Sequence, residues 1–495
     1  MTTDAAQVWH RLSPRMLLVH PVHEVVRQIP VLVGSVVLGS ATGNPMWAIG
    51  VLAATVAFGI ARWFTTAYRI GPGEVQLRAG VLQRKVLSVP RNRIRSVSTD
   101  ARLLHRVLGL TVLQVSTGQE AKGAAAFELD AVRAEQVGRL RAVLLADKLA
   151  PADDPAQVPD RELARWQPAW LRYSPLSFTG LAMIAAAAGL VYQAGIGSLL
   201  EDSRIARTGV DAAQRFGVAA AAVAAVGVVL LASVLLSVLQ SLLTYGNLVL
   251  VRRDAAGNEG VLHLQHGLVR VREHTFDMRR LRGGTLREPL LVRLFGGARL
   301  DAVMTGVGGA GEASLLLPPC PKETAAAVLT DLIERPDAVS GALRRHGPVA
   351  ARRRWTRALA APVLMAAGLA ALAATASVPG WCWAVVAILT VCCALLAADR
   401  SRSLGHRVGD GWLVARAGSL HRRRDCIAAP GIIGWTVRQT FFQRRAGVAT
   451  LIAATAAGVK RYQVLDVPAD LAWSVAAAAS AWVADSEWAR GPDLR

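Results

Sequence analysis

Three short basic clusters each follow a glycine that ends an alternating apolar stretch. They are Gln83-Arg84-Lys85, Arg270-Val271-Arg272 and His421-Arg422-Arg423-Arg424. Basic side chains on such a hairpin could meet the anionic headgroups of a membrane leaflet, at about 1 kcal/mol per residue near the surface. A run of charge can equally be a hairpin that is merely solvated, so both interpretations stay open.

An arginine also recurs at a fixed distance after these glycines. Arg106, Arg293 and Arg444 each stand three residues before another glycine and just after an apolar pair. Arginine has five N–H donors, so it could either donate to the backbone carbonyls of a turn or recognise a phosphate. With the nearby Arg93 and Arg95, these side chains complete the candidate set for lipid or partner binding. The set is Arg84, Lys85, Arg93, Arg95, Arg106, Arg270, Arg272, Arg293, Arg422, Arg423 and Arg444.

The candidate residues belong to a block that occurs three times in the chain. Its anchors are Gly73, Gly80, Arg106 and Gly109, then Gly260, Gly267, Arg293 and Gly296, then Gly411, Gly418, Arg444 and Gly447. The spacings between successive anchors are 7, 26 and 3 residues in every block. This agreement predicts an internal repeat, with a glycine where one strand turns into the next.

Each block should fold as several short strands followed by one amphipathic helix. Val75, Leu77 and Val81 alternate with other residues at the period of a strand. Apolar residues at helical spacing close the blocks. They are Val137, Leu140 and Leu144, then Val328, Leu329 and Leu332, then Leu471, Val475, Ala478 and Trp482. We expect a bent sheet packed against its closing helix.

Apolar stretches precede each block in pairs. The chain of 495 residues is 53% hydrophobic, yet it carries a net charge of +21, a combination typical of a membrane protein with basic flanks. Arginines near the spans, including Arg352–Arg354 and Arg357, gather on the side of the blocks, which predicts that this side is cytoplasmic. The six expected spans are about Gln28–Thr42, Met46–Phe64, Phe178–Leu200, Phe216–Tyr245, Ala358–Val378 and Trp381–Ala398.

Two stretches of the first block are similar to a known family. Val89–Val97 reads VPRNRIRSV and Leu103–Leu110 reads LLHRVLGL, and together they resemble the bacterial pleckstrin-homology (PH) domain of YdbT-like membrane proteins. The second block lacks the Val-Pro pair, and the third, at Ala429–Ile433, lacks the basic residues around this strand. The resemblance implies PH-like domains behind pairs of transmembrane helices, with a shorter single-domain protein of the same kind as a partner.

The expected fold is therefore a multi-domain membrane protein. Six transmembrane helices form three hairpins, and each hairpin is followed by a cytoplasmic PH-like domain, a bent antiparallel β-sandwich or barrel with a C-terminal helix. The expected segments are 1–64 (N-terminal segment and hairpin 1), 65–150 (PH-like domain 1), 151–245 (linker and hairpin 2), 246–336 (PH-like domain 2), 337–398 (linker and hairpin 3), 399–488 (PH-like domain 3) and 489–495 (tail).

Several classes of function find no support in the sequence. It holds no G-x-S-x-G, H-E-x-x-H or P-loop motif and no CxxC pair, so we expect neither an enzyme nor a bound cofactor or metal. The basic residues lack the motifs of nucleic-acid binding. The expected spans hold almost no ionisable residue, which disfavours a carrier.

We expect instead a non-enzymatic protein of the bacterial cytoplasmic membrane, multi-pass, with both termini in the cytoplasm. Its PH-like domains would bind anionic lipid headgroups or proteins, as a scaffold or in the response to envelope stress. The alternative is a transporter or export accessory whose helices form a substrate path. A homo-oligomer stays open as an assembly.

Overall fold

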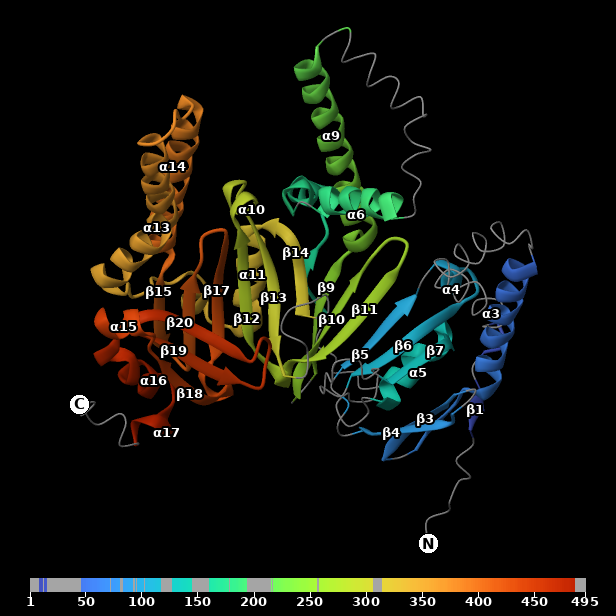
Figure 1. Ribbon diagram of the computed structural model, residues 1–495. Coiled ribbons are helices and arrows are strands. Elements are labelled where there is room, and N and C mark those ends of the chain that lie inside the picture. Colours follow the sequence, from blue (N-terminus) through green and yellow to red (C-terminus); the bar gives the residue numbers. More distant parts are fainter. Residues whose placement is uncertain are drawn as a thin grey trace. The chain divides into compact units, whose positions relative to one another are not determined.

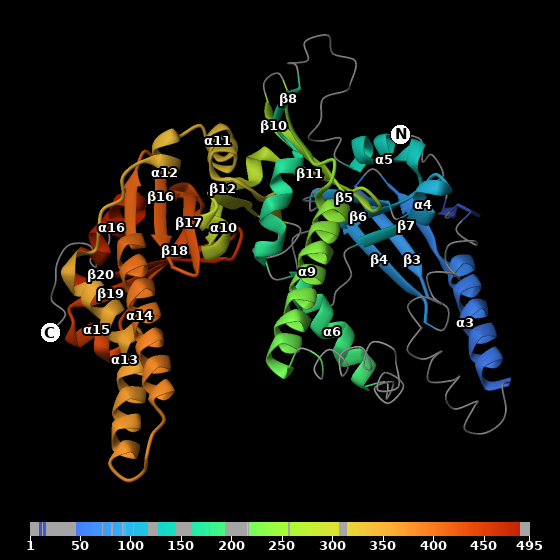
Figure 2. The ribbon, with the colours of Figure 1, turned by 90° about the horizontal axis from the view of Figure 1, so that it is seen from above.

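The computed structural model describes residues 9–11, 13–15, 46–71, 73–80, 83–91, 94, 96–101, 103–116, 127–144, 160–177, 179–193, 215, 217–255, 258–305 and 314–485. The chain divides into two compact units. Unit 1 comprises Met1–Arg165 and Leu243–Arg280, and unit 2 comprises Trp166–Leu242 and Leu281–Arg495. Figures 1 and 2 show the helices and strands of each unit from two directions.

Unit 1 contains two antiparallel sheets. The first has the order β1 (His10–Arg11), β2 (Ala67–Ile70), β3 (Glu74–Ala79) and β4 (Lys85–Pro90). The second has the order β7 (Phe127–Arg133), β6 (Leu110–Ser116), β5 (Ser96–Ala101), β11 (Val271–Asp277), β10 (Asn258–His266), β9 (Val249–Ala255) and β8 (Arg161–Arg165). The helical segments are α3 (Met46–Thr65), α4 (Leu103–Val107), α5 (Ala134–Leu144) and η3 (Met278–Arg280).

The first block packs its two sheets around one apolar core. Val75 and Val89 come from the first sheet, and Val97 and Leu113 from the second. Val137 of α5 lies in the same core, so the predicted amphipathic helix does close the sheets of this block. Alternation of side chains along each strand is what directs these valines and leucines to one face.

Unit 2 also contains two antiparallel sheets. They have the orders β14 (Leu315–Pro321), β13 (Gly297–Met304), β12 (Leu281–Pro289), β17 (His421–Ala428), β16 (Trp412–Ala417) and β15 (Gly405–Gly409), and β18 (Ile432–Arg438), β19 (Val448–Thr455) and β20 (Arg461–Pro468). The helical segments are η2 (Pro168–Ser177), α6 (Thr179–Gln193), α9 (Val218–Tyr245, ending in unit 1), α10 (Leu290–Leu294), α11 (Lys322–Ile333), α12 (Pro336–Ser340), α13 (Gly347–Ala373), α14 (Gly380–Ser403), η5 (Ala429–Gly431), α15 (Phe441–Arg445), η6 (Ala469–Leu471), α16 (Ala472–Ala479) and α17 (Ala481–Ala484).

One sheet of each unit joins strands from two successive blocks. In unit 1, β5 of the first block pairs antiparallel with β11 of the second; in unit 2, β12 of the second block pairs antiparallel with β17 of the third. We call these two pairings the joints. Figure 1 shows each as a continuous run of neighbouring strands.

The two joints have the same register. Ala101 lies opposite Val271 in the first, and Glu288 lies opposite Arg422 in the second. Ala101 and Glu288 each stand 21 residues after the second glycine of their block (101−80 and 288−267), and Val271 and Arg422 each stand 4 residues after theirs (271−267 and 422−418). Equivalent positions therefore meet at both joints.

The second glycine of each block has a backbone that other residues rarely adopt. Gly80, Gly267 and Gly418 have φ values of +128°, +106° and +103°. A Cβ at any of them would lie 2.3 Å or less from the carbonyl oxygen of the residue three positions later. Glycine alone fits such a turn without strain, which explains its recurrence before each basic cluster.

Three helices are long and apolar enough to cross a membrane among the described residues: α9, α13 and α14. The expected second span is the helix α3, and the expected third is helical over α6, whereas 28–42 and 194–200 lie outside the described residues. α13 begins at Gly347 rather than near Ala358, because the arginine-rich segment before the apolar stretch continues the same helix.

The closing helix of the third block differs from the prediction. Its apolar stripe predicts one helix through Trp482, but α16 ends at Ala479 and the chain is extended at Ser480, with φ −138° and ψ 106°. The Ser480 hydroxyl accepts a hydrogen bond from Nε1 of Trp435 at 3.0 Å. This contact to β18 stabilises the break, and α17 starts a new turn.

Candidate functional site

In unit 1, two of the candidate arginines connect the first block to the second. Nε of Arg270 donates to both carboxylate oxygens of Asp100, at 2.7 and 2.9 Å. Nη1 of Arg106 donates to the carbonyl oxygen of Leu268 at 2.8 Å. Both arginines bind groups of the neighbouring block across the first joint, so each has a structural role there.

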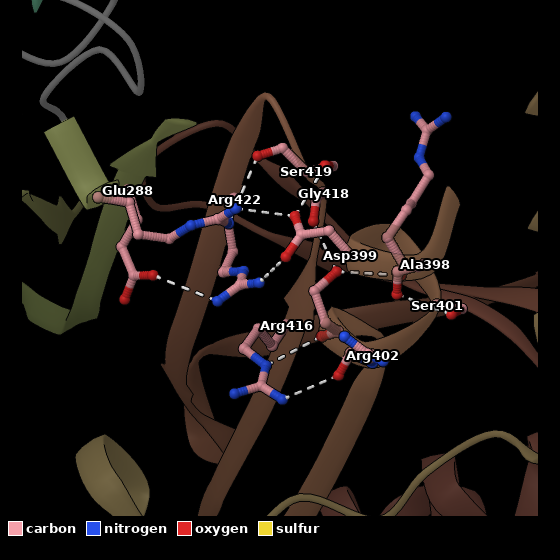
Figure 3. Close-up of polar contacts among 12 residues, drawn as sticks. Glu288, Ala398, Asp399, Ser401, Arg402, Arg416, Gly418, Ser419 and Arg422 are labelled. Carbon is pink, nitrogen blue, oxygen red and sulfur yellow. Dashed lines mark hydrogen bonds and ion pairs between the residues drawn. The ribbon is translucent and has the colours of Figure 1, made fainter. Parts of the chain in front are cut away.

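At the second joint, the candidate arginines surround a carboxylate at the end of α14 (Figure 3). Nη2 of Arg293 donates to Asp399 at 2.8 Å, and Nη2 of Arg422 donates to its other oxygen at 2.6 Å. The Ser419 hydroxyl donates to the same carboxylate at 2.7 Å. Nη1 of Arg293 reaches the carbonyl oxygen of Ser419 at 3.4 Å, which matches the contact that Arg106 makes at the first joint.

Hydrogen bonds from side chains to backbone carbonyls connect the same end of α14 to β16 and to the turn between β16 and β17. Nε of Arg416 donates to the carbonyl oxygen of Ser403 at 2.9 Å, and the Ser403 hydroxyl donates to the carbonyl oxygen of Gly418 at 2.6 Å (Figure 3). An apolar helix long enough to span a membrane is thus held directly by the hairpin that carries a basic cluster.

A buried carboxylate lies within the second joint itself. Asp425 accepts a hydrogen bond from the hydroxyl of Thr285 at 2.9 Å and pairs with Arg423 at 3.3 Å. Burial raises the pKa of Asp425 although Arg423 opposes this shift, because desolvation disfavours the charged form. Arg423 therefore forms an ion pair with a buried carboxylate of the second joint.

The remaining candidates differ in their surroundings. Arg84, Lys85 and Arg444 are exposed, and their side chains have no hydrogen bond or ion pair with the residues that the structure describes. Arg272 is half-buried in β11. Arg93 and Arg95 lie outside the described residues. The structure thus brings Arg293 and Arg422 together and leaves the candidates at the two ends of the series of blocks in solvent.

A cavity that the sequence did not predict lies beside α13, in unit 2. Its volume is about 1060 Å³. The first turns of α13, the end of β18, α15 and the strands β19 and β20 form its walls. It is lined by Arg352, Arg353, Thr356, Arg357, Ala360, Arg438, Thr440, Phe442, Gln443, Arg445, Ala446, Thr450, Ile452, Gln463 and Leu465.

Local structure places the basic residues of this cavity. α15 starts with a capping box, in which Thr440 and Gln443 each bond the backbone of the other, which fixes the helix between Arg438 before it and Arg445 at its end. Nε2 of Gln443 also donates to Asp466 at 2.8 Å. Asp466 is buried and pairs with Arg354 at 2.6 Å and Arg353 at 3.5 Å.

Positive charge dominates the rest of the cavity. Arg352, Arg357, Arg438 and Arg445 are exposed, and none of their side chains has an ion pair or hydrogen-bond partner among the described residues. Guanidinium groups present planar forks of donors that suit phosphate oxygens. Four such groups around one hollow suit an anionic group with phosphate oxygens.

Some residues of this cavity stand out in the sequence, but they have a second explanation. The sequence indicates Arg352–Arg354 and Arg357 only as charges that orient a membrane span. Arg438 and Arg445 stand within eight residues of the recurring Arg444, yet nothing local shows that they face α13. In the described part of the chain, no group of three or more His, Cys, Asp or Glu side chains could hold a metal ion.

Comparison with protein families gives one match. The family described as Bacterial PH domain matches residues 25–148 and 361–481. Each matched stretch starts in or before an apolar helix and ends just after a closing helix, α5 or α16. No curated protein and no solved structure matches the chain significantly. The narrower resemblance to YdbT-like proteins stays a prediction, whereas these two stretches show that the chain belongs to the bacterial PH-domain family.

Proposed function

We propose that the protein is a non-enzymatic membrane protein whose PH-like domains bind anionic lipid headgroups at the cytoplasmic leaflet of the bacterial inner membrane. The observation that carries this proposal is the cavity beside α13, where Arg352, Arg357, Arg438 and Arg445 have no described partner. A scaffold role follows, because a protein held at the leaflet can also present its sheets to other proteins.

The position of the cavity supports a lipid as the ligand. Arg352 and Arg357 belong to α13, one of the three helices that are long and apolar enough to cross a membrane. Basic residues at the cytoplasmic end of a span lie at the depth of the headgroups. A headgroup of the same leaflet could therefore enter the cavity without leaving the bilayer.

The proposed organisation extends the described helices to six spans in three hairpins, with both termini in the cytoplasm. Three PH-like domains would follow the hairpins. The shared anchor spacings and the equal registers of the two joints support three copies of one module. The family match covers the first and third of these modules together with their apolar helices.

Lipid binding by the full-length protein in detergent micelles tests the proposal. The probe is short-chain dioctanoyl phosphatidylglycerol, and the neutral reference is dioctanoyl phosphatidylcholine. The variant Arg438→Ala/Arg445→Ala removes two cavity charges. Its matched control is Arg335→Ala/Arg461→Ala, since both of these arginines are exposed in unit 2 and lie outside the cavity.

We expect the wild-type protein to prefer the anionic probe. At about 1 kcal/mol per basic residue, the cavity variant should bind phosphatidylglycerol roughly 30-fold more weakly. The control should bind as the wild type does. Equal affinities of the cavity variant and the control would refute the assignment of this site, because both lose the same charge.

A further inference from the structure

The series of joints is open at both ends. β5 and β12 begin the second sheet of the first and second blocks, and each is paired with the third strand of the next block, β11 or β17. The corresponding first strand of the last sheet is β18, and the corresponding third strand of the first block is β4. Among the described strands, β18 pairs only with β19 and β4 pairs only with β3.

The open edge of β4 exposes apolar side chains, since Val86 is 57% and Leu87 is 42% exposed. In the corresponding part of β18, Thr436 is exposed and Val437 is half-buried. An unpaired edge with exposed apolar residues is a template for another strand. Native proteins usually block such an edge with proline or charge. Pro90 of β4 lies outside the part that the joints would use, whereas Lys85 of β4 and Arg438 of β18 are exposed charges within it.

The recurring arginine of the third block also lacks the partner that its counterparts have. At the two joints, Arg106 and Arg293 donate to the carbonyl oxygen of the residue that follows the second glycine of the next block, Leu268 or Ser419. Arg444 occupies this position in the third block, and it is exposed without a described partner.

The apolar pair before the arginine differs in the same way. Leu290 and Leu291 are half-buried, and the backbone N–H of Leu290 donates to the carbonyl oxygen of Leu420 at 2.8 Å. Phe441 and Phe442 at the equivalent positions of the third block are 72% and 73% exposed. The end of the series presents the groups that the second joint uses.

We propose that a second copy of the chain completes the series, with β18 of one copy paired antiparallel to β4 of the next. The register of the two joints places Gln439 opposite Arg84 and Val437 opposite Val86. Arg444 then occupies the place that Arg106 and Arg293 occupy at the first two joints. The partner is a second copy because one chain carries both halves of the missing joint, in the form that twice joins its own blocks.

This third joint brings apolar residues together at its centre, but the same register places Lys85 opposite Arg438, and like charges directly opposite each other oppose the pairing. The central position of the joint brings two valines together, whereas the first joint has Thr99 opposite Glu273 there. Apolar β-branched pairs stabilise neighbouring strands. Such a head-to-tail contact repeats from copy to copy and yields a ring or a filament in the membrane plane.

Disulfide cross-linking in native membranes tests this assembly. Two full-length chains with different tags are expressed together, one carrying Val86→Cys and the other Val437→Cys. Mild oxidation should yield a dimer that contains both tags. Val459→Cys in place of Val437→Cys is the matched control, because Val459 is exposed in the turn between β19 and β20, away from the open edge.

Adding Arg444→Ala to the Val437→Cys chain should lower the yield about fivefold, the effect expected for one lost hydrogen bond. Adding Arg461→Ala should leave it unchanged. A dimer yield no higher than that of the control would overturn the proposal. It would also be overturned if Val437→Cys cross-linked to a different protein, or if the bond formed only within one chain that carries both cysteines.

Discussion

Replacing Asp399 with asparagine tests whether the recurring arginines are structural. Asp399 accepts hydrogen bonds from Arg293, Arg422 and Ser419. The side chains of Arg293 and Arg422 are only 15% and 19% exposed. Asparagine keeps the shape of the side chain but removes its charge, so Arg293 would lose its carboxylate partner and Arg422 would keep only Glu288, at 3.7 Å, in a place that water reaches poorly.

The cost follows from this burial. Removing one partner of a buried ion pair costs about 3–5 kcal/mol. Asp399 is itself 27% exposed, so we expect the low end, about 3 kcal/mol. For a cooperative unit of roughly 150–250 residues, this lowers Tm by about 6–12 °C.

Thermal unfolding of the full-length protein in detergent, followed by tryptophan fluorescence, measures the change. Asp410→Asn is the control, because the ion pair of Asp410 with Arg407 spans 3.9 Å at a side chain that is 65% exposed. Exposed pairs contribute about 0–1 kcal/mol. Equal Tm values for the two variants would refute the structural role of the Asp399 cluster.

Thiol labelling of Cys426 provides a local readout of the same change. Cys426 lies in β17, is fully buried, and has a pKa that burial raises to about 12. Maleimide should therefore react with it only when β17 separates from its neighbours. In the Asp399→Asn variant the reaction should accelerate below Tm, whereas in Asp410→Asn it should keep the wild-type rate.

Two further changes test the packing of unit 2. Gly283→Ala should lower the free energy of unfolding by more than about 2 kcal/mol, since φ at Gly283 is +138° and a Cβ would lie 1.8 Å from the carbonyl oxygen of Cys426. The control Gly409→Ala should change Tm little, because a Cβ there meets nothing within 4 Å. Equal decreases of Tm in the two variants would contradict this prediction. Burial lowers the pKa of His406 to about 4, and also lowers the pKa of His346, whose Nε2 is 2.8 Å from Nδ1 of His406. Between about pH 4 and pH 6.5 the unfolded chain then binds more protons than the folded chain, so the free energy of unfolding should fall by about 2 kcal/mol from pH 7 to pH 5. His406→Gln should flatten the dependence of Tm on pH, whereas the control His421→Gln should leave it unchanged. An unchanged slope in His406→Gln would refute the assignment to His406.

Local sequence patterns were sufficient to predict several strands and helices of the blocks. Alternation around Val75 predicted β3, and the stripe with Val137 predicted α5, because a strand and an amphipathic helix each need only their own residues to show a buried face. Ser480 shows the limit of this reasoning. Its break depends on Trp435, a residue 45 positions away, and no helical periodicity records such a contact.

The roles of the basic residues could not be read from spacing for a related reason. The acceptors of Arg270 and Arg106 lie 170 and 162 residues away in the sequence. A guanidinium group suits a carboxylate, a carbonyl or a phosphate equally well, so the residue type leaves the choice open. The fold determines the acceptors, because it places Asp100 and the Leu268 carbonyl at hydrogen-bond distance from these arginines.

The joints also explain why a block in the sequence is not the same as a compact unit in space. The predicted limits 246–336 enclose both β11 and β12, yet β11 belongs to a sheet of unit 1 and β12 to a sheet of unit 2. Cutting the chain at the limits of a block would leave β5 or β17 without its neighbouring strand and Arg106 without its acceptor. The full-length chain is therefore the proper object for lipid-binding and assembly experiments, since an excised block would expose edges that the chain normally pairs.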